Sequence, residues 1–209
     1  EPDSDPAVAE HARHLGNNLG RPIMAKVASG NNSETDVVLV GNGYNSSRES
    51  ASLFVFNLTT GALIRRLTVP ATTVATTGGN GLAMPGVFDA NGDGRIDVAY
   101  AGDMFGQVWR FDLSSSNPVN WSVSNNGAPI YVARDAVGNT QPITAPLTVA
   151  VNSVSVDPNF GKRFVFFGTG SYFQTGDPAS KRSQTLYSIV DDPTAPHTGR
   201  DQLRSRTLS

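Results

Sequence analysis

Short apolar segments recur along the chain in three similar sets. In each set a first segment begins near a proline, a second ends in glycine or Gly-Asp, and a third alternates apolar and polar residues. Short β-branched and aromatic runs bounded by Gly, Pro and Asn predict strands. The sets are Pro22–Val27, Asp36–Gly43 and Ser52–Leu58 with Ala62–Leu67; Pro85–Phe88, Asp97–Asp103 and Gln107–Leu113; and Pro146–Val149, Arg163–Gly170 and Thr185–Val190.

The sets follow one another at a spacing of about 60 residues, which is typical of repeated antiparallel blades with long loops. The sequence therefore predicts an all-β fold, a partial or modified β-propeller, over residues 21–209. Closed propellers use about four to eight blades, so three sets are expected to form part of a larger propeller, in a processed product or a piece of a longer protein. Residues 1–20 are expected to be a lead-in with a short helix over Pro6–Leu15.

Three long polar segments, residues 71–81, 113–127 and 171–184, are predicted to be loops. Loops on a rigid sheet scaffold often carry binding residues. Trp109 lies in an alternating strand and is expected in the core between sheets, whereas Trp121 lies in a polar loop and is the better candidate for ligand contact.

Composition narrows the possible partners. Charged residues make up 16% of the chain and its formal net charge is −2, so nothing indicates nucleic acid or an acidic membrane surface as partner. The absence of cysteine excludes thiol catalysis, zinc–thiolate sites and disulfides. No apolar run approaches the roughly 18 residues of a membrane span, so none is predicted in this chain.

Oxygen-bearing side chains alternate along one short segment. Asp89, Asn91 and Asp93 stand two residues apart, Gly94 permits a sharp turn that directs the Arg95 carbonyl inward, and Asp97 completes the set. Such a donor set suits calcium, which takes six to eight oxygens in flexible geometry. The alternative is an Asn/Asp/Gly-rich turn without a metal. We predict a calcium site.

The flanks of this segment distinguish it from an EF-hand. Tyr100 occupies the twelfth position, where an EF-hand supplies a bidentate carboxylate. The neighbouring segments are short, apolar and strand-like, so the loop is predicted to lie at the tip of a strand–loop–strand unit. Asp103 and Asp112 could add ligands, but their places at strand ends favour capping of backbone N–H groups.

The histidines give little support for a second metal site or for a catalytic triad. His11 and His14 stand three residues apart on the predicted helix, a spacing that could hold a metal, but no carboxylate partner is evident and a surface helix is favoured. A Ser-His-Asp triad would need His11, His14 or His197, all near the ends of the chain. The Gly-rich segments at residues 78–81 and 168–170 lack a following Lys and helix, so they are interpreted as turns. We do not expect an enzyme.

Several motifs, in order, closely resemble the C-terminal propeller domain of the type IV pilus tip adhesin family (PilY family). The most specific is the calcium loop followed at once by YAGDMFGQVWRFDL. The others are Val40–Asn45, Leu53–Phe56 with Thr60–Gly61, Gly81–Pro85, Gln141–Thr144 and Phe167–Gly170. They cover nearly the whole chain after residue 20.

The resemblance implies a β-propeller in a large secreted protein of the bacterial surface, or of the periplasm in transit. It implies calcium on the Arg95 carbonyl and the side chains of Asp89, Asn91, Asp93 and Asp97. Implied partners are pilus proteins such as minor pilins, or a host or abiotic surface, with roles in pilus extension and retraction, adhesion and twitching motility. Asn91 replaces a common Asp, which predicts weaker binding because ligand charge tunes affinity. No Arg-Gly-Asp tripeptide occurs.

Two other propeller classes stay open. Integrin-α-like propellers carry short calcium loops of the same form, in which the metal only braces a hairpin; this chain would then be a general extracellular module binding protein or glycan. Quinone-dependent dehydrogenase propellers share the Thr60–Gly61 type of turn, but this chain has no vicinal Cys pair and no ring of His or Asp for a cofactor.

Overall fold

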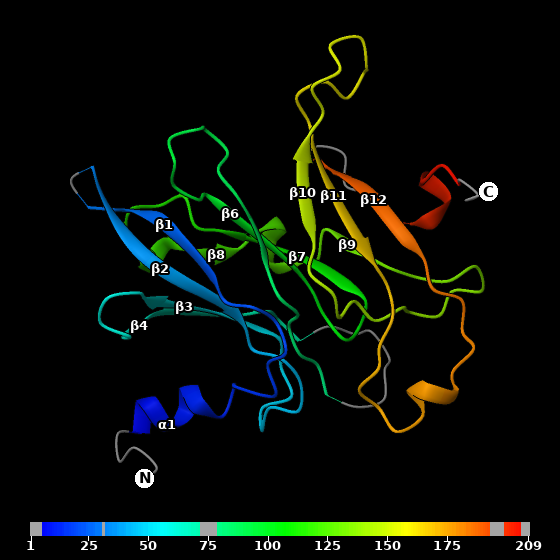
Figure 1. Cartoon of the computed structure of the whole chain (residues 1–209), viewed down its shortest axis with the longest axis horizontal. Coiled ribbons are helices and arrows are strands. Elements are labelled where there is room, and N and C mark those ends of the chain that lie inside the picture. Colours follow the sequence, from blue (N-terminus) through cyan, green and yellow to red (C-terminus); the bar gives the residue numbers. More distant parts are fainter. Residues whose placement is uncertain (1–5, 31, 72–78, 193–198, 206–209) are drawn as a thin grey trace.

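Three antiparallel sheets form the framework of the part of the molecule that the structure describes (Figure 1). The computed structural model describes residues 6–30, 32–71, 79–192 and 199–205. The sheets follow one another along the chain, and each begins where one of the three sequence sets begins. The predicted all-β fold is confirmed.

The first sheet has the order β1-β2-β3-β4, the second β5-β6-β7-β8 with β9 also paired to β7, and the third β10-β11-β12. The bounds are β1 (Ile23–Ser29), β2 (Ser33–Gly41), β3 (Ser52–Asn57), β4 (Leu63–Thr68), β5 (Gly86–Phe88), β6 (Val98–Gly102), β7 (Gln107–Asp112), β8 (Ser122–Val123), β9 (Tyr131–Val132), β10 (Thr148–Val151), β11 (Arg163–Gly168) and β12 (Leu186–Asp191). Among the described residues, three short 3-10 helices lie in the connections, η1 (Pro118–Asn120), η2 (Asn125–Gly127) and η3 (Asp177–Ala179), and a fourth, η4 (Arg200–Gln202), follows β12.

The second sheet lies between the other two and is buried on both faces. All five residues of β6 are buried, and the first four alternate between two hydrophobic cores. Ala99 and Ala101 join Trp109 against the first sheet, whereas Val98 and Tyr100 join a core with the third sheet. This explains the nearly continuous apolar run of β6, because a strand covered on both faces needs no polar alternation.

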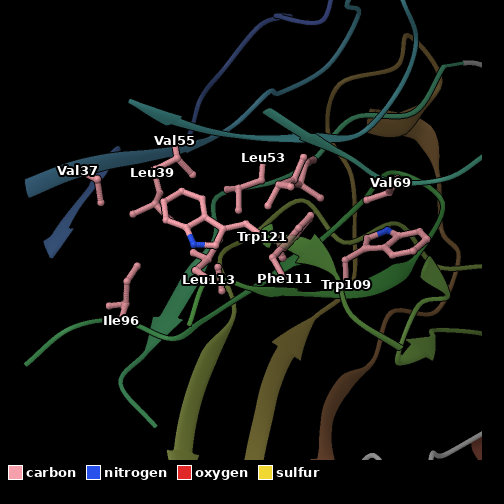
Figure 2. Packing of buried hydrophobic residues seen from close by; sticks show 14 of the residues in the cluster. Val37, Leu39, Leu53, Val55, Val69, Ile96, Trp109, Phe111, Leu113 and Trp121 are labelled. Atoms are coloured by element: carbon pink, nitrogen blue, oxygen red, sulfur yellow. The ribbon is translucent and has the colours of Figure 1, made fainter. Parts of the chain in front are cut away.

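Trp109 is fully buried between the first and second sheets, as predicted. Trp121 was expected to be available to a ligand, and this expectation was wrong: its side chain is 2% exposed. Figure 2 shows its indole among Leu39, Val55 and Leu113. The segment 113–127 is not simply a loop, because it contains η1, β8 and η2, and β8 pairs with β7.

The lead-in contains the predicted helix, α1, but it covers Pro6–Ala12 and ends before Leu15, so His14 lies beyond the helix. Glu10 on α1 accepts hydrogen bonds from the guanidinium of Arg48 at 2.5 and 2.9 Å, which ties the helix to the loop after β2. His14 is buried, and its Nδ1 lies 2.9 Å from Ser50 Oγ. Among the described residues no helix is long and apolar enough to cross a membrane.

The first and second strands of each sheet are joined by connections of different lengths. These are residues 30–32 between β1 and β2, residues 89–97 between β5 and β6, and residues 152–162 between β10 and β11. The last projects well beyond the sheets (Figure 1) and exposes Val154, Val156 and Phe160.

Candidate metal centre

The predicted metal loop joins β5 to β6, and its two ends are held by main-chain bonds. Asp97 N donates to Phe88 O at 3.0 Å, and Phe88 pairs with Val98. Ile96 N donates to Lys26 O at 2.8 Å, and the Ile96 side chain packs into the core with the first sheet. The strand–loop–strand arrangement is therefore as predicted.

Asp89 organises the loop by accepting backbone hydrogen bonds. Its Oδ1 accepts from the N–H groups of Asn91, Gly92 and Asp93 at 3.2, 2.7 and 3.3 Å, and its Oδ2 accepts from Gly94 N at 2.7 Å. These bonds, with that from Gly94 the largest contributor, lower the pKa of Asp89. These hydrogen bonds therefore hold residues 91–94 in a tight turn around the Asp89 carboxylate.

Glycine is needed at two positions of this curl. Gly92 and Gly94 have φ angles of 78° and 84°, in the left-handed region where a Cβ is unfavourable. The sharp turn predicted at Gly94 is therefore present.

The Asp93 carboxylate is hydrogen-bonded and ion-paired to the neighbouring Arg95. Its Oδ1 accepts from Arg95 N at 2.9 Å, and its Oδ2 accepts from the Arg95 guanidinium through Nε at 3.0 Å and Nη2 at 2.5 Å. The hydrogen bond from the Arg95 side chain is the main reason that the pKa of Asp93 falls to about 2. Arg95 had been expected to contribute only its carbonyl, so this side-chain role is an addition.

The other two predicted ligand side chains, those of Asn91 and Asp97, accept hydrogen bonds from backbone N–H groups. Asn91 Oδ1 accepts from Asp93 N at 2.9 Å, and Asp97 Oδ2 accepts from Ala90 N at 2.8 Å. Within the described part of the chain, no three His, Cys, Asp or Glu side chains form a group that could hold a metal. The donor types fit a hard cation, namely three carboxylates, one amide oxygen and one carbonyl. However, the carboxylates are directed to N–H groups and to Arg95 and not to a common centre.

The other acidic candidates cap backbone groups, as predicted. Asp103 is fully buried and accepts from the N–H groups of Phe105 and Gln107. Asp112 is exposed and accepts from the N–H and hydroxyl of Ser114 at 3.0 and 2.6 Å. Asp112 pairs with Val98, next to the loop, but its carboxylate makes no hydrogen bond to residues 89–97 among the described residues, and nor does that of Asp103.

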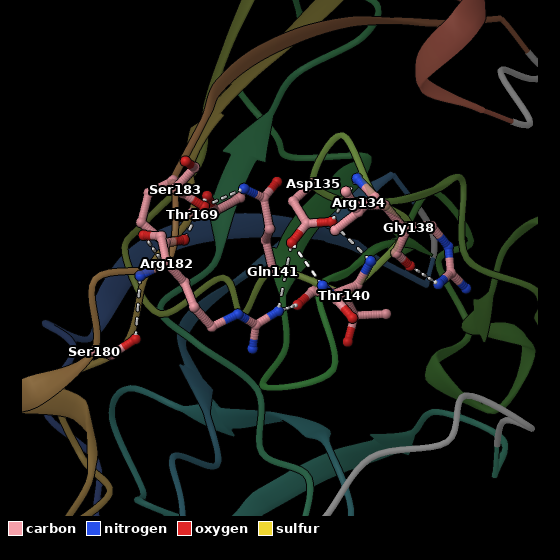
Figure 3. A network of polar contacts seen from close by, with 12 residues as sticks. Arg134, Asp135, Gly138, Thr140, Gln141, Thr169, Ser180, Arg182 and Ser183 are labelled. Carbon is pink, nitrogen blue, oxygen red and sulfur yellow. Dashed lines mark hydrogen bonds and ion pairs between the residues drawn. The ribbon is translucent and has the colours of Figure 1, made fainter.

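Away from this loop, a polar network fixes the segment between β11 and β12, defined here as the strap, residues 171–184 (Figure 3). Arg182 donates to Thr140 O at 3.0 Å and lies 3.9 Å from the Asp135 carboxylate. Gln141 donates to Ser183 O at 2.8 Å. The strap was predicted to be a loop, and apart from η3 it is one.

Known proteins match this chain over nearly its full length. Residues 1–206 match the family model described as the PilY1 beta-propeller domain. A type IV pilus biogenesis factor PilY1 homolog of Xylella fastidiosa is 35% identical over 96% of this chain, and the type IV pilus biogenesis factor PilY1 of Pseudomonas aeruginosa is 35% identical over 93%. This chain spans only 14% and 18% of those two relatives.

A solved structure agrees with these matches. The crystal structure of the P. aeruginosa PilY1 C-terminal domain has a TM-score of 0.73 and 34% sequence identity to this chain, covering 87% of this chain and 39% of that one. The relatives are named as pilus biogenesis factors and not as enzymes. The family resemblance inferred from the sequence is confirmed, and the chain belongs to the PilY1 β-propeller domain family.

Proposed function

We propose that this chain is a non-catalytic, calcium-binding propeller module of a type IV pilus biogenesis protein. The observation that carries the proposal is the loop at residues 89–97, an exposed set of oxygen donors at the tip of a β-hairpin. The names of the relatives support a place in pilus biogenesis. Its location would be the bacterial surface, or the periplasm in transit, with minor pilins or an attachment surface as partner.

Calcium would be held by the side chains of Asp89, Asn91, Asp93 and Asp97 and by the Arg95 carbonyl. The cation would neutralise three carboxylates in one loop and order the tip of the β5–β6 hairpin. An ordered tip could then favour one contact of the pilus assembly over another, and so affect pilus extension and retraction, adhesion and twitching motility.

The hydrogen bonds of the loop favour an exchangeable site over a permanent brace. Asp89 and Asn91 already hold the turn through backbone donors, and Ile96 anchors its base in the core. The fold therefore does not depend on a cation at this tip. A cation would also compete with the Arg95 guanidinium for the Asp93 carboxylate, which lowers the net affinity.

The test is a calorimetric calcium titration of chelator-stripped chain. Asp97→Asn keeps an oxygen for Ala90 N and removes one charge, so we expect at least about tenfold weaker binding with unchanged melting in chelator. Arg95→Gln keeps the carbonyl and frees Asp93, so we expect tighter binding. Asp112→Asn serves as the matched control and should bind calcium as the wild type does.

Melting provides a second readout. Calcium at about 100 times its dissociation constant should add about 2.7 kcal/mol of stability in the wild type and less in Asp97→Asn. Unchanged affinity in Asp97→Asn would refute the ligand assignment. Absence of calcium binding by folded, metal-free wild-type chain would refute the calcium site itself. A very tight, always occupied site would favour the integrin-α-like structural role.

A further inference from the structure

A cavity of about 250 Å³ lies where the segments leading into the first strands of the three sheets come together. It is lined by residues 18–21 of the lead-in, residues 43–44 after β2, residues 82–84 before β5, and by Thr144, Pro146 and Phe173. Its walls thus come from segments that flank all three sheets, and it shares no residue with the loop at residues 89–97. Pockets for larger ligands measure roughly 300–1,000 Å³, so this one suits a ligand no larger than an amino acid or a monosaccharide.

One wall of this cavity is a pair of stacked aromatic rings. The rings of Tyr44 and Phe173 lie 4.1 Å apart between centroids with an interplanar angle of 28°. Tyr44 is 7% exposed, whereas Phe173 is 38% exposed. Such a wall offers a flat apolar surface to a ring or an alkyl chain.

The aromatic wall is held in place by the strap. Asp177 Oδ2 accepts from Phe173 N at 2.7 Å, Gln174 N at 2.8 Å and Ser171 Oγ at 2.6 Å. Arg182 fastens the far end of the strap to Thr140 O. A preformed wall reduces the entropy lost when a ligand binds.

The lining of the cavity carries positive charge only. Arg21 is the single charged residue of its lining, so no carboxylate of the lining neutralises it. The Arg21 side chain is exposed and makes no hydrogen bond or ion pair with any residue that the structure describes. A free guanidinium beside an apolar wall matches a carboxylate, which it can bind through two parallel hydrogen bonds.

We infer that this cavity binds a small carboxylate-bearing molecule or side chain whose ring or apolar body packs on Phe173 and Tyr44 while its carboxylate pairs with Arg21. An acidic sugar and the end of a peptide carry the same chemistry. This site is independent of the calcium proposal, so it is tested on calcium-stripped chain from which the chelator, itself a polycarboxylate, has been removed.

The experiment is a titration of the chain with two matched pairs of ligands, followed by calorimetry and NMR. The pairs are N-acetylphenylalanine with its neutral amide, and glucuronate with glucose. We expect at least one acid to bind with millimolar or tighter affinity, and its neutral counterpart to bind about tenfold more weakly. Binding of N-acetylphenylalanine would indicate the end of a peptide as the ligand, and binding of glucuronate would indicate an acidic sugar.

Variants locate the site. Arg21→Gln should weaken the acid at least about tenfold, and Arg13→Gln, which removes the same charge outside the cavity, should not. Phe173→Leu removes the stacked ring and should also weaken binding, while its melting temperature reports whether the chain stays folded. The inference is overturned if neither acid binds, if acid and neutral ligands bind equally, or if Arg21→Gln binds as the wild type does.

Discussion

At the residue scale, Asp103 shows how a charge is kept inside this fold. Its Oδ2 accepts from Asn80 Nδ2, Gln107 Nε2 and Trp109 Nε1 at 2.8 to 2.9 Å, and its Oδ1 accepts from the N–H groups of Phe105 and Gln107. Burial raises the pKa of this carboxyl and the hydrogen bonds oppose the rise. Both oxygens of the Asp103 carboxylate therefore accept hydrogen bonds, and their donors connect the segment before β5 with β7.

Asp103→Asn should therefore be costly although it is nearly isosteric. The new amide places N–H donors against donors already present, which leaves buried groups unpaired and costs about 3 kcal/mol of unfolding free energy. Urea denaturation measures this loss. Asp112→Asn alters an exposed cap and should cost about 0.5 kcal/mol, and equal losses in the two variants would contradict the account.

The oxygen-bearing side chains of residues 89–97 could be picked out from local spacing, because they all lie within nine consecutive residues, but their joint binding of calcium stays a prediction. The Asp93–Arg95 pair could have been found in the same way, since acid and base stand two residues apart. Trp121 was misassigned because what covers it, Leu39 and Val55, belongs to another sheet. The contact of Tyr44 with Phe173 had no sequence signal for the same reason.

At the element scale, α1 and the residues after it are attached through ionisable groups. His14 is buried beside Ser50, and its Nε2 lies 3.4 Å from Glu10 Oε1. Burial first, and then the charge of Arg66, lower the pKa of His14 below its usual 6.5, while Glu10 acts in the opposite direction. The folded chain therefore disfavours the protonated imidazole.

The sign of the pH effect follows from this lowered pKa. His14 supports folding above about pH 6.5, and that support is lost as the pH falls through the folded-state pKa, because the unfolded chain takes up the proton first. We expect the melting temperature to fall between pH 7 and pH 5, and to fall less in His14→Gln. Equal shifts in wild type and variant, measured by calorimetry, would show that His14 is not the group responsible.

Strands were predictable where the periodic pattern was long enough. β3, β7 and β12 agree with their predicted segments to within one residue at each end. β8 and β9 are two residues long, too short to show any alternation, and they are strands only because β7 supplies their hydrogen bonds. A tertiary neighbour, and not their own sequence, decides their conformation.

At the scale of the whole molecule, an ionic cluster joins the second sheet to the third. Asp191 on β12 accepts from Tyr100 Oη at 2.5 Å and from Arg110 Nη1 at 2.8 and 3.0 Å, and lies 3.3 Å from Arg163 Nη2. The Asp191 side chain is only 2% exposed. The repeats predicted three sheets, but no pattern within one repeat could show this cluster, because its members come from two of them.

Asp191→Asn should loosen the contact between these sheets. It leaves two guanidinium groups without their counter-charge and should cost about 3–5 kcal/mol of unfolding free energy. The neighbouring Asp192→Asn alters a more exposed ion pair with Lys162 and should cost about 0.5 kcal/mol. Chemical denaturation of both variants distinguishes the two cases, and a similar small loss in each would mean that the apolar core alone holds the sheets together.

The connections between the first and second strands of the three sheets are the parts of this chain that can change most easily during evolution. The same position holds a short connection in the first sheet, the Asp- and Gly-rich loop at residues 89–97 in the second, and a long projection with exposed Val154, Val156 and Phe160 in the third. Since the tips of these connections lie outside both cores, substitutions there avoid the packing constraints that act on the buried strand residues. The length and the polar side chains of these connections can therefore change while the strands of each sheet keep their packing.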